Sequence, residues 1–276
     1  MHHSRVFKIL TAAVLLPVFF ASCFDPQEGC LDTSAINFNP AADKDCCCRY
    51  PSLVLSVEQV YGSQVFKQDS LYEDAGGHLF RIKNMVFYLS EFQVFRGAET
   101  FTMGDSLEFK TYDATRSDTI LQTFIDDYTL IRRVPLENSV ASFRESGEFD
   151  KIRFRVGLSQ AATAIIPALT PSNHPLRPQK ENLYANGDYV LLQAVVVRDS
   201  MAATAVDTLN FTRSDIGDLF VSGNWNFQHD TGYNFTVKLK TDWAVLFDGV
   251  DWTNHDVQAW KDRIVANLPS IFTISQ

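Results

Sequence analysis

The feature that most constrains this fold is a succession of short alternating segments with few helical patterns between them. The segment "LVLSVEQVY", which begins at Leu53, alternates and is rich in Val and Leu. Four similar segments follow along the chain, each bounded by Gly, Asp, Asn or Ser: SLEFKTYD, FDKIRFRVGL, DTLNFT and YNFTVKLKT. Alternation with a period of two predicts strands with one buried face. Consecutive strands without helices between them predict a mainly β protein, an antiparallel β-sandwich.

Two further segments refine this prediction. Residues 78–96, HLFRIKNMVFYLSEFQVFR, predict two strands with a kink near Asn84. Residues 189–197, YVLLQAVVV, are apolar almost throughout, which predicts a strand buried on both faces.

A short helix is expected near the C-terminus, in NHDVQAWKDRIVANL. Asn254 or Asp256 supplies an N-cap, and Pro269 ends the helix. Its apolar stripe consists of Val257, Trp260, Ile264 and Leu268. The segment TDWAVLFDG predicts one short helical turn.

The N-terminus, MHHSRVFKILTAAVLLPVFFASC, has the pattern of a signal peptide. Arg5 and Lys8 precede an apolar run that is shorter than the ~20 residues of a membrane span. The run ends in small residues and Cys23, as in a bacterial lipobox, so we expect residues 1–22 to be removed and Cys23 to be lipidated. The alternative is ordinary secretion with Cys23 incidental. Acyl chains would anchor the protein to a membrane, as an outer-membrane lipoprotein of the cell envelope on its periplasmic or surface face.

Composition excludes some functions. The net charge of −9 and the pI near 5.1 argue against nucleic acid as a partner, because phosphates require a basic surface. The chain has no G-x-S-x-G, H-E-x-x-H or P-loop motif, so we expect no enzyme.

Four cysteines remain if Cys23 is lipidated: Cys30, Cys46, Cys47 and Cys48. The oxidising envelope favours disulfides over a thiolate metal site. Four cysteines allow three pairings, and the residues alone leave these open.

Residues 29–50, GCLDTSAINFNPAADKDCCCRY, resemble a short cysteine-bounded module common in secreted Bacteroidetes proteins. The shared pattern is G-C-x-D-x-x-A-x-N-[YF]-N-P-x-A followed by acidic residues and C-x-Y. The resemblance implies a disulfide between Cys30 and Cys48, and leaves Cys46 and Cys47 as a vicinal pair or as free thiols. The module would follow a tether, residues 23–28. Its Asp and Asn residues suit either calcium or turns, and we favour turns.

Residues 53–276 resemble the MbnP-like family, secreted β-sandwich proteins named for a methanobactin-associated copper protein. The resemblance rests on the order of three groups of residues: Gly77 to Ser90, Phe149 to Leu158, and Val237 to Phe272. It implies copper as a cofactor. Family members usually carry a tryptophan-containing segment that residues 183–189 lack, so the copper ligands cannot be carried over residue by residue.

The histidines that remain after processing are His78, His174, His229 and His255. Imidazole nitrogen suits copper, and we name His78, His174 and His229 as the candidate metal site, although no pair has a sharp metal spacing. The alternative is that all four are ordinary loop and cap residues.

Two functions therefore remain. The first is a lipid-anchored envelope protein that binds copper or another metal. The second is a structural or interaction lipoprotein that binds a protein partner or a glycan without metal.

Overall fold

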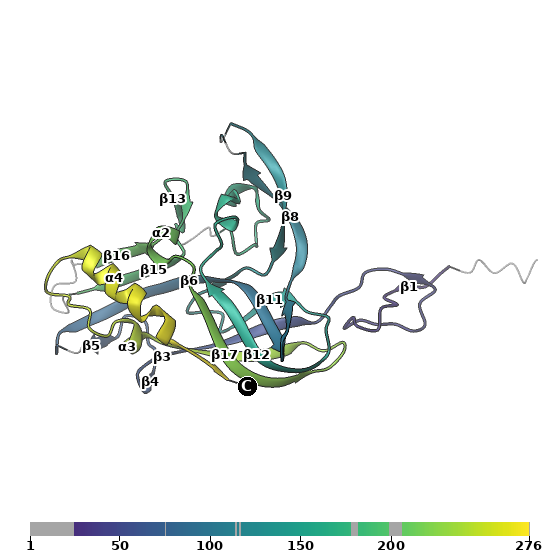
Figure 1. Ribbon diagram of the computed structural model, residues 1–276, viewed down its shortest axis with the longest axis horizontal. Coiled ribbons are helices and arrows are strands. Elements are labelled where there is room, and N and C mark those ends of the chain that lie inside the picture. Colours follow the sequence, from purple (N-terminus) through teal and green to yellow (C-terminus); the bar gives the residue numbers. More distant parts are fainter. Residues whose placement is uncertain are drawn as a thin grey trace, which may run out of the picture.

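The computed structural model describes residues 25–74, 76–113, 115, 117–177, 182–198 and 206–275. Two sheets pack face to face as a β-sandwich (Figure 1), which confirms the predicted mainly β class. The predicted signal peptide and Cys23 lie outside the described residues. No helix among the residues described has the length and apolar character needed to cross a membrane.

The larger sheet has eight strands in the order β16-β15-β6-β12-β17, and β5, β7 and β10 also pair with β6. Its strands are β5 (Leu71–Glu73), β6 (Leu79–Arg96), β7 (Glu99–Thr102), β10 (Thr129–Ile131), β12 (Gly147–Val156), β15 (Leu192–Val197), β16 (Val206–Phe211) and β17 (Phe220–His229). All of these pairings are antiparallel.

The smaller sheet has five strands in the order β11-β3-β18-β19, with β4 on β3. The strands are β3 (Ser52–Tyr61), β4 (Gln64–Val65), β11 (Glu137–Ser142), β18 (Phe235–Asp242) and β19 (Phe272–Ser275). Strands β3 and β18 are parallel, which differs from the antiparallel expectation. Parallel neighbours require a long crossover, and here the chain forms the whole eight-stranded sheet between them. Two-stranded sheets complete the β structure: β1 (Glu28–Gly29) with β2 (Lys44–Asp45), β8 (Asp105–Tyr112) with β9 (Thr119–Asp126), and β13 (Tyr184–Ala185) with β14 (Asp188–Tyr189).

Strand β6 corrects one prediction. Residues 79–96 form one continuous strand rather than two strands separated by a kink. The irregularity near Asn84 is a shift in register against β15, where Val195 faces Asn84 and Val196 faces Ile82. A bulge bends a strand without ending it, so the chain changes direction and keeps its pairing.

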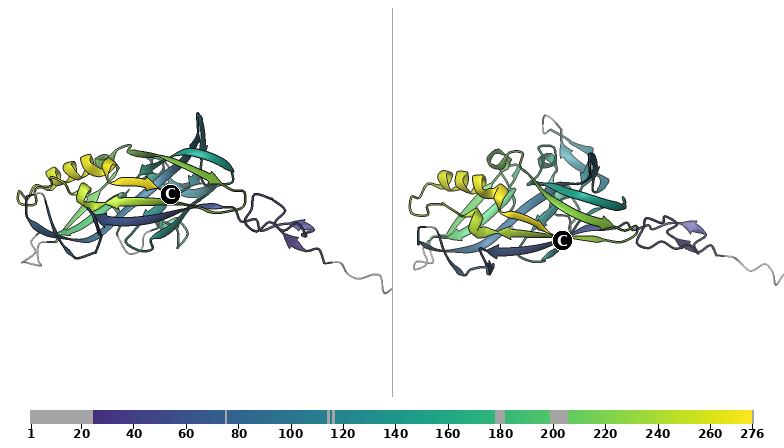
Figure 2. Two further views of the ribbon diagram at one scale, coloured as in Figure 1. Left: turned by 90° about the horizontal axis from the view of Figure 1, so that it is seen from below. Right: turned by 60° about the horizontal axis from the view of Figure 1, so that its bottom comes forward.

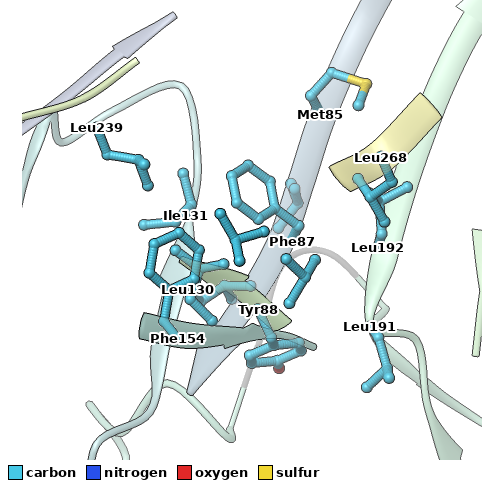
Figure 3. Close-up of a cluster of buried hydrophobic side chains, with 14 of the residues drawn as sticks. Met85, Phe87, Tyr88, Leu130, Ile131, Phe154, Leu191, Leu192, Leu239 and Leu268 are labelled. Atoms are coloured by element: carbon cyan, nitrogen blue, oxygen red, sulfur yellow. The ribbon is translucent and has the colours of Figure 1, made fainter. Parts of the chain in front are cut away.

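The core lies between the two sheets and is almost entirely apolar and aromatic. Figure 3 shows side chains from β6, β12 and β18 converging there, among them Phe87, Phe154 and Leu239. Residues 192–197 are buried except for half-buried Val195, so β15 is buried on both faces as predicted.

The helices are short, and α3 (Trp243–Leu246) and α4 (Val257–Asn267) lie at one end of the sandwich (Figure 1). Helix α4 is capped by Asp256, whose carboxylate accepts hydrogen bonds from Gln258 and Ala259, and it buries Trp260 and Ile264. A 3₁₀ turn, η4 (Leu268–Ser270), carries Pro269 and ends it. The predicted turn at residues 241–249 is α3 (Trp243–Leu246). The remaining helical elements are α2 (Arg213–Ile216), η2 (Ala162–Ala164) and η3 (Pro167–Leu169).

The cysteine module, residues 29–50, extends from the other end of the long axis (Figure 2). Cys30 pairs with Cys48, as the module resemblance implies, and Cys46 pairs with Cys47. The Asp and Asn side chains bind the backbone of the module: Asp32 accepts from Ser34, and Asn39 accepts from Ala41. This is the turn-forming role favoured above.

Candidate functional site

His229 is the last residue of β17 and is 1% exposed. Nδ1 lies 2.5 Å from the carbonyl oxygen of Glu145, and Nε2 lies 2.8 Å from that of Tyr233. A carbonyl only accepts hydrogen bonds, so both ring nitrogens are directed at acceptors. A carbonyl oxygen therefore blocks each nitrogen, and neither is open to an ion in this arrangement.

His174 lies in the loop between η3 and β13, and both of its ring nitrogens also take part in hydrogen bonds. The backbone N–H of Leu176 donates to Nδ1, and Nε2 lies 2.9 Å from a carboxylate oxygen of Asp126. Nδ1 is therefore the acceptor, and the proton on Nε2 is donated to Asp126. The ring packs edge-on against Phe109 and Tyr128, which makes His174 part of the support under the β8–β9 hairpin.

His78 lies in the turn that leads into β6, and its side chain is 51% exposed. Nδ1 is 3.3 Å from Asp74, whose carboxylate also accepts the backbone N–H of His78. This histidine forms part of a turn at the surface.

The structure does not bring His78, His174 and His229 together as a metal site. Among the residues described, one group of three metal-ligating side chains has its ligand atoms close enough to share an ion, namely Cys30, Asp45 and Cys48. Its two cysteines are joined to each other, and a disulfide offers no thiolate ligand. His78 and His174 lie in a turn and a loop, His229 ends a strand, and the ring nitrogens of all three lie close to polar groups of the protein.

A different surface has the features of a binding site. The outer face of the eight-stranded sheet is open to solvent across β7, β6, β12 and β17. Registers place these residues on one face: Thr100, Thr102, Gln93, Phe95, Lys151, Arg153, Ser222, Asn224, Asn226 and Gln228. We call this set the polar sheet face.

Strand β17 forms the most regular part of the polar sheet face. Ser222, Asn224, Asn226 and Gln228 are all exposed, while Val221 and Trp225 point the other way and are buried. Alternate residues of a strand repeat at ~7 Å. The strand therefore presents a row of uncharged hydrogen-bonding groups at regular intervals.

Two cations lie in the middle of the polar sheet face. Lys151 Nζ is 5.0 Å from the centre of the Phe95 ring, and the Arg153 guanidinium carbon is 4.9 Å from that of Phe220. Arg153 also donates Nε to the side-chain oxygen of Gln93 at 3.1 Å. These contacts hold both side chains against the outer face of the sheet. Their charged groups therefore lie on the polar sheet face.

The polar sheet face continues into a hollow of about 740 Å³ at one end. The hollow is lined by Arg96, Glu148, Phe149, Asp150, Asn226, Phe227 and Gln228. Phe149 and Phe227 stack at 5.1 Å beneath it, and the Arg96 guanidinium lies 4.8 Å from the Phe149 ring. Its walls thus combine two aromatic rings with amides and charges of both signs.

The sequence prediction missed this surface because it missed β17. Asn224 and Asn226 are uncommon in strands, so the sequence of this segment is a weak strand signal. The alternation of Val221, Trp225 and Phe227 with polar residues was the available signal.

Comparisons with known proteins give limited guidance. No family model matches the chain, and no curated protein matches it. Among solved structures the chain is similar to MbnP from Methylosinus trichosporium, with 10% sequence identity and a TM-score of 0.44, over 80% of this chain and 96% of that protein. At this level the similarity carries no argument about function, which is therefore argued from the residues of this chain.

Proposed function

We propose that this protein is a non-enzymatic, lipid-anchored envelope protein that binds a glycan on the polar sheet face. The observation that carries the proposal is the continuity of the open face with the hollow. Together they form one uncovered surface, supplied with amides, hydroxyls and two outward-facing cations.

The chemistry of the surface favours a sugar polymer. Glycans present hydroxyl groups at regular intervals, and the side chains of β17 repeat in the same way along the strand. Lys151 and Arg153 add charge complementarity to carboxylate, sulfate or phosphate groups.

The glycan proposal is tested by removing the row on β17. The triple variant Asn224→Ala, Asn226→Ala and Gln228→Ala loses three hydrogen-bonding side chains, each of which contributes about 0.5–1.5 kcal/mol. Affinity electrophoresis against neutral and acidic polysaccharides should show binding about 10- to 100-fold weaker than that of the unchanged chain.

A matched control is Gln64→Ala, which removes an exposed amide from β4 on the other sheet. This variant should migrate like the unchanged chain. The proposal fails if no polysaccharide retards the unchanged chain, or if the triple variant is retarded to the same extent.

The lipid anchor is a separate part of the proposal and rests on the N-terminal sequence. Cys23→Ser removes the acceptor sulfur and should abolish fatty-acid labelling of the protein. Each buried CH₂ contributes about 0.8 kcal/mol, so a chain that starts at residue 23 and carries Cys23→Ser should be released from the membrane fraction. Fatty-acid labelling that persists in Cys23→Ser would contradict an anchor at this residue.

A resident copper centre is not part of the proposal. Both ring nitrogens of His174 and of His229 are engaged within the protein, and the exposed His78 has a carboxylate as its neighbour. Copper sites in proteins are built from two or three imidazoles or from sulfur ligands. Among the residues that the structure describes, His78, His174 and His229 therefore do not form a copper site.

A further inference from the structure

The β8–β9 hairpin stands away from the sandwich (Figure 1) and has one covered edge. At the β8 edge, Thr111 forms a bridge with Ile165, and the backbone N–H of Ile166 donates to the carbonyl oxygen of Lys110 at 3.0 Å. Within the described ranges β9 pairs with β8 alone. The outer side of β9 is therefore an edge whose backbone groups face solvent.

Strand β9 lacks the features that protect natural sheet edges. Residues 119–125, TILQTFI, contain no charge and no proline in a chain that is 21% charged. The register of β9 with β8 runs from Thr119 to Asp126 without a bulge. Its apolar side chains are exposed, with Leu121 at 59%, Ile120 at 41% and Ile125 at 38%. A flat, uncharged and apolar edge is a template for another strand.

We propose that β9 is a homodimer interface, in which the β9 strands of two copies pair antiparallel to form a four-stranded sheet. A two-fold axis perpendicular to such a sheet places opposite each other residues that lie on the same face. One residue at the centre therefore lies opposite the same residue of the second copy. When that residue is Thr123, Leu121 of each copy lies opposite Ile125 of the second copy. Leu121 and Ile125, which are exposed apolar side chains on the same face of β9, then cover each other on either side of a Thr–Thr pair.

The distribution of charge allows a second copy of the chain to contact β9, and it favours one register of the two β9 strands. Two copies that each carry a charge of −9 repel at most contact points, but residues 119–125 bring no charge to the contact. Pairing centred on Gln122 would instead set Asp118 opposite Asp126, and like charges directly opposite destabilise a sheet. Pairing centred on Thr123 places Asp126 opposite Ile120.

The proposal is tested with the chain from residue 23 onward carrying Cys23→Ser, so that neither acyl chains nor the apolar N-terminal run can cause association. Sedimentation over a concentration series should show a monomer–dimer equilibrium that strengthens with salt, because salt screens the remaining repulsion. Leu121→Lys places charge at the interface and should weaken dimerisation at least about tenfold. Leu107→Lys makes the same change on β8, where Leu107 is 43% exposed, and should have little effect.

Cysteine substitutions test the register. Residues directly opposite in an antiparallel pair have Cα atoms ~4.5–5.5 Å apart, which suits a disulfide. Thr123→Cys should therefore form a covalent dimer on oxidation faster than Leu121→Cys or Gln122→Cys, with the bond mapped to residue 123 by mass spectrometry. A chain that stays monomeric at every concentration, or a dimer that Leu121→Lys and Leu107→Lys weaken equally, overturns the proposal.

Discussion

Replacing Trp243 with alanine is expected to lower the free energy of unfolding by about 3–5 kcal/mol. Trp243 is fully buried, and its ring lies edge-on to Phe66 at 6.2 Å and to Phe87 at 5.9 Å. Its Nε1 donates to the side-chain oxygen of Gln59 at 3.3 Å. The substitution leaves a cavity between the two sheets and removes the donor from Gln59, which is itself buried. Because domains are stable by only about 5–15 kcal/mol, the variant should be close to unfolding.

Denaturation in guanidinium, followed by circular dichroism, measures this effect. Trp243→Phe is the control, because it keeps an aromatic ring between Phe66 and Phe87 and loses only the indole N–H and some volume. We expect it to retain most of the stability that Trp243→Ala loses. A cost below about 1 kcal/mol for Trp243→Ala would show that the core closes around the cavity.

Asp127 is expected to make the protein more stable at mildly acidic pH than at neutral pH. The side chain is 2% exposed at the end of the hairpin, and it accepts the backbone N–H of Phe92 at 2.7 Å. Burial raises the pKa of Asp127 to about 7, although backbone hydrogen bonds from Glu91 and Phe92 oppose the shift.

The sign of the effect follows from proton binding. In the unfolded chain an aspartate has a pKa near 3.9, so between pH ~4 and ~7 the folded state keeps a proton that the unfolded state has released. The free energy of unfolding therefore falls as the pH rises, by about 1.4 kcal/mol per unit and about 4 kcal/mol at most over this window. Below and above it the contribution of Asp127 is constant.

Asp127→Asn should remove this slope, because an amide does not titrate. The measurement is the denaturation midpoint of Asp127→Asn and of the unchanged protein between pH 4.5 and 8. The difference between the two midpoints at each pH gives the contribution of Asp127. Asp251→Asn is the control. Hydrogen bonds from the Thr253 hydroxyl and backbone lower the pKa of Asp251, so its titration lies below the window. If the denaturation midpoints of Asp127→Asn and of the unchanged protein change with pH in parallel, Asp127 is already ionised at pH 5.

The sequence predicted those elements whose local pattern and tertiary environment agree. Strand β15 is apolar except for Gln193 and lies between β16 and β6 in the larger sheet, while helix α4 begins at a capping aspartate and ends before a proline. The sequence did not predict strand β17, because its exposed residues include Asn224 and Asn226, and asparagine favours turns. Pairing with β12 along most of its length overrides that preference.

The histidines show a second limit of sequence reasoning. Their number and residue type agreed with a copper site, but a ligand needs an uncommitted nitrogen as well as neighbours. Whether a ring nitrogen is occupied depends on partners distant in sequence, such as Glu145 for His229 and Asp126 for His174, which are 84 and 48 residues away. No pattern along the chain reveals these contacts.

The position of the cysteine module determines how it transmits force. It lies between the proposed anchor and the sandwich, and its two ends are held with the Cα atoms of Cys30 and Cys48 4.8 Å apart across 18 residues. Tyr50, at the boundary, stacks under Arg144, which in turn pairs with Asp105 at the base of the hairpin. A pull on the N-terminus therefore passes through the covalent bridge to the sandwich without extending the loop. The module would act as an inextensible link between the tether and the sandwich.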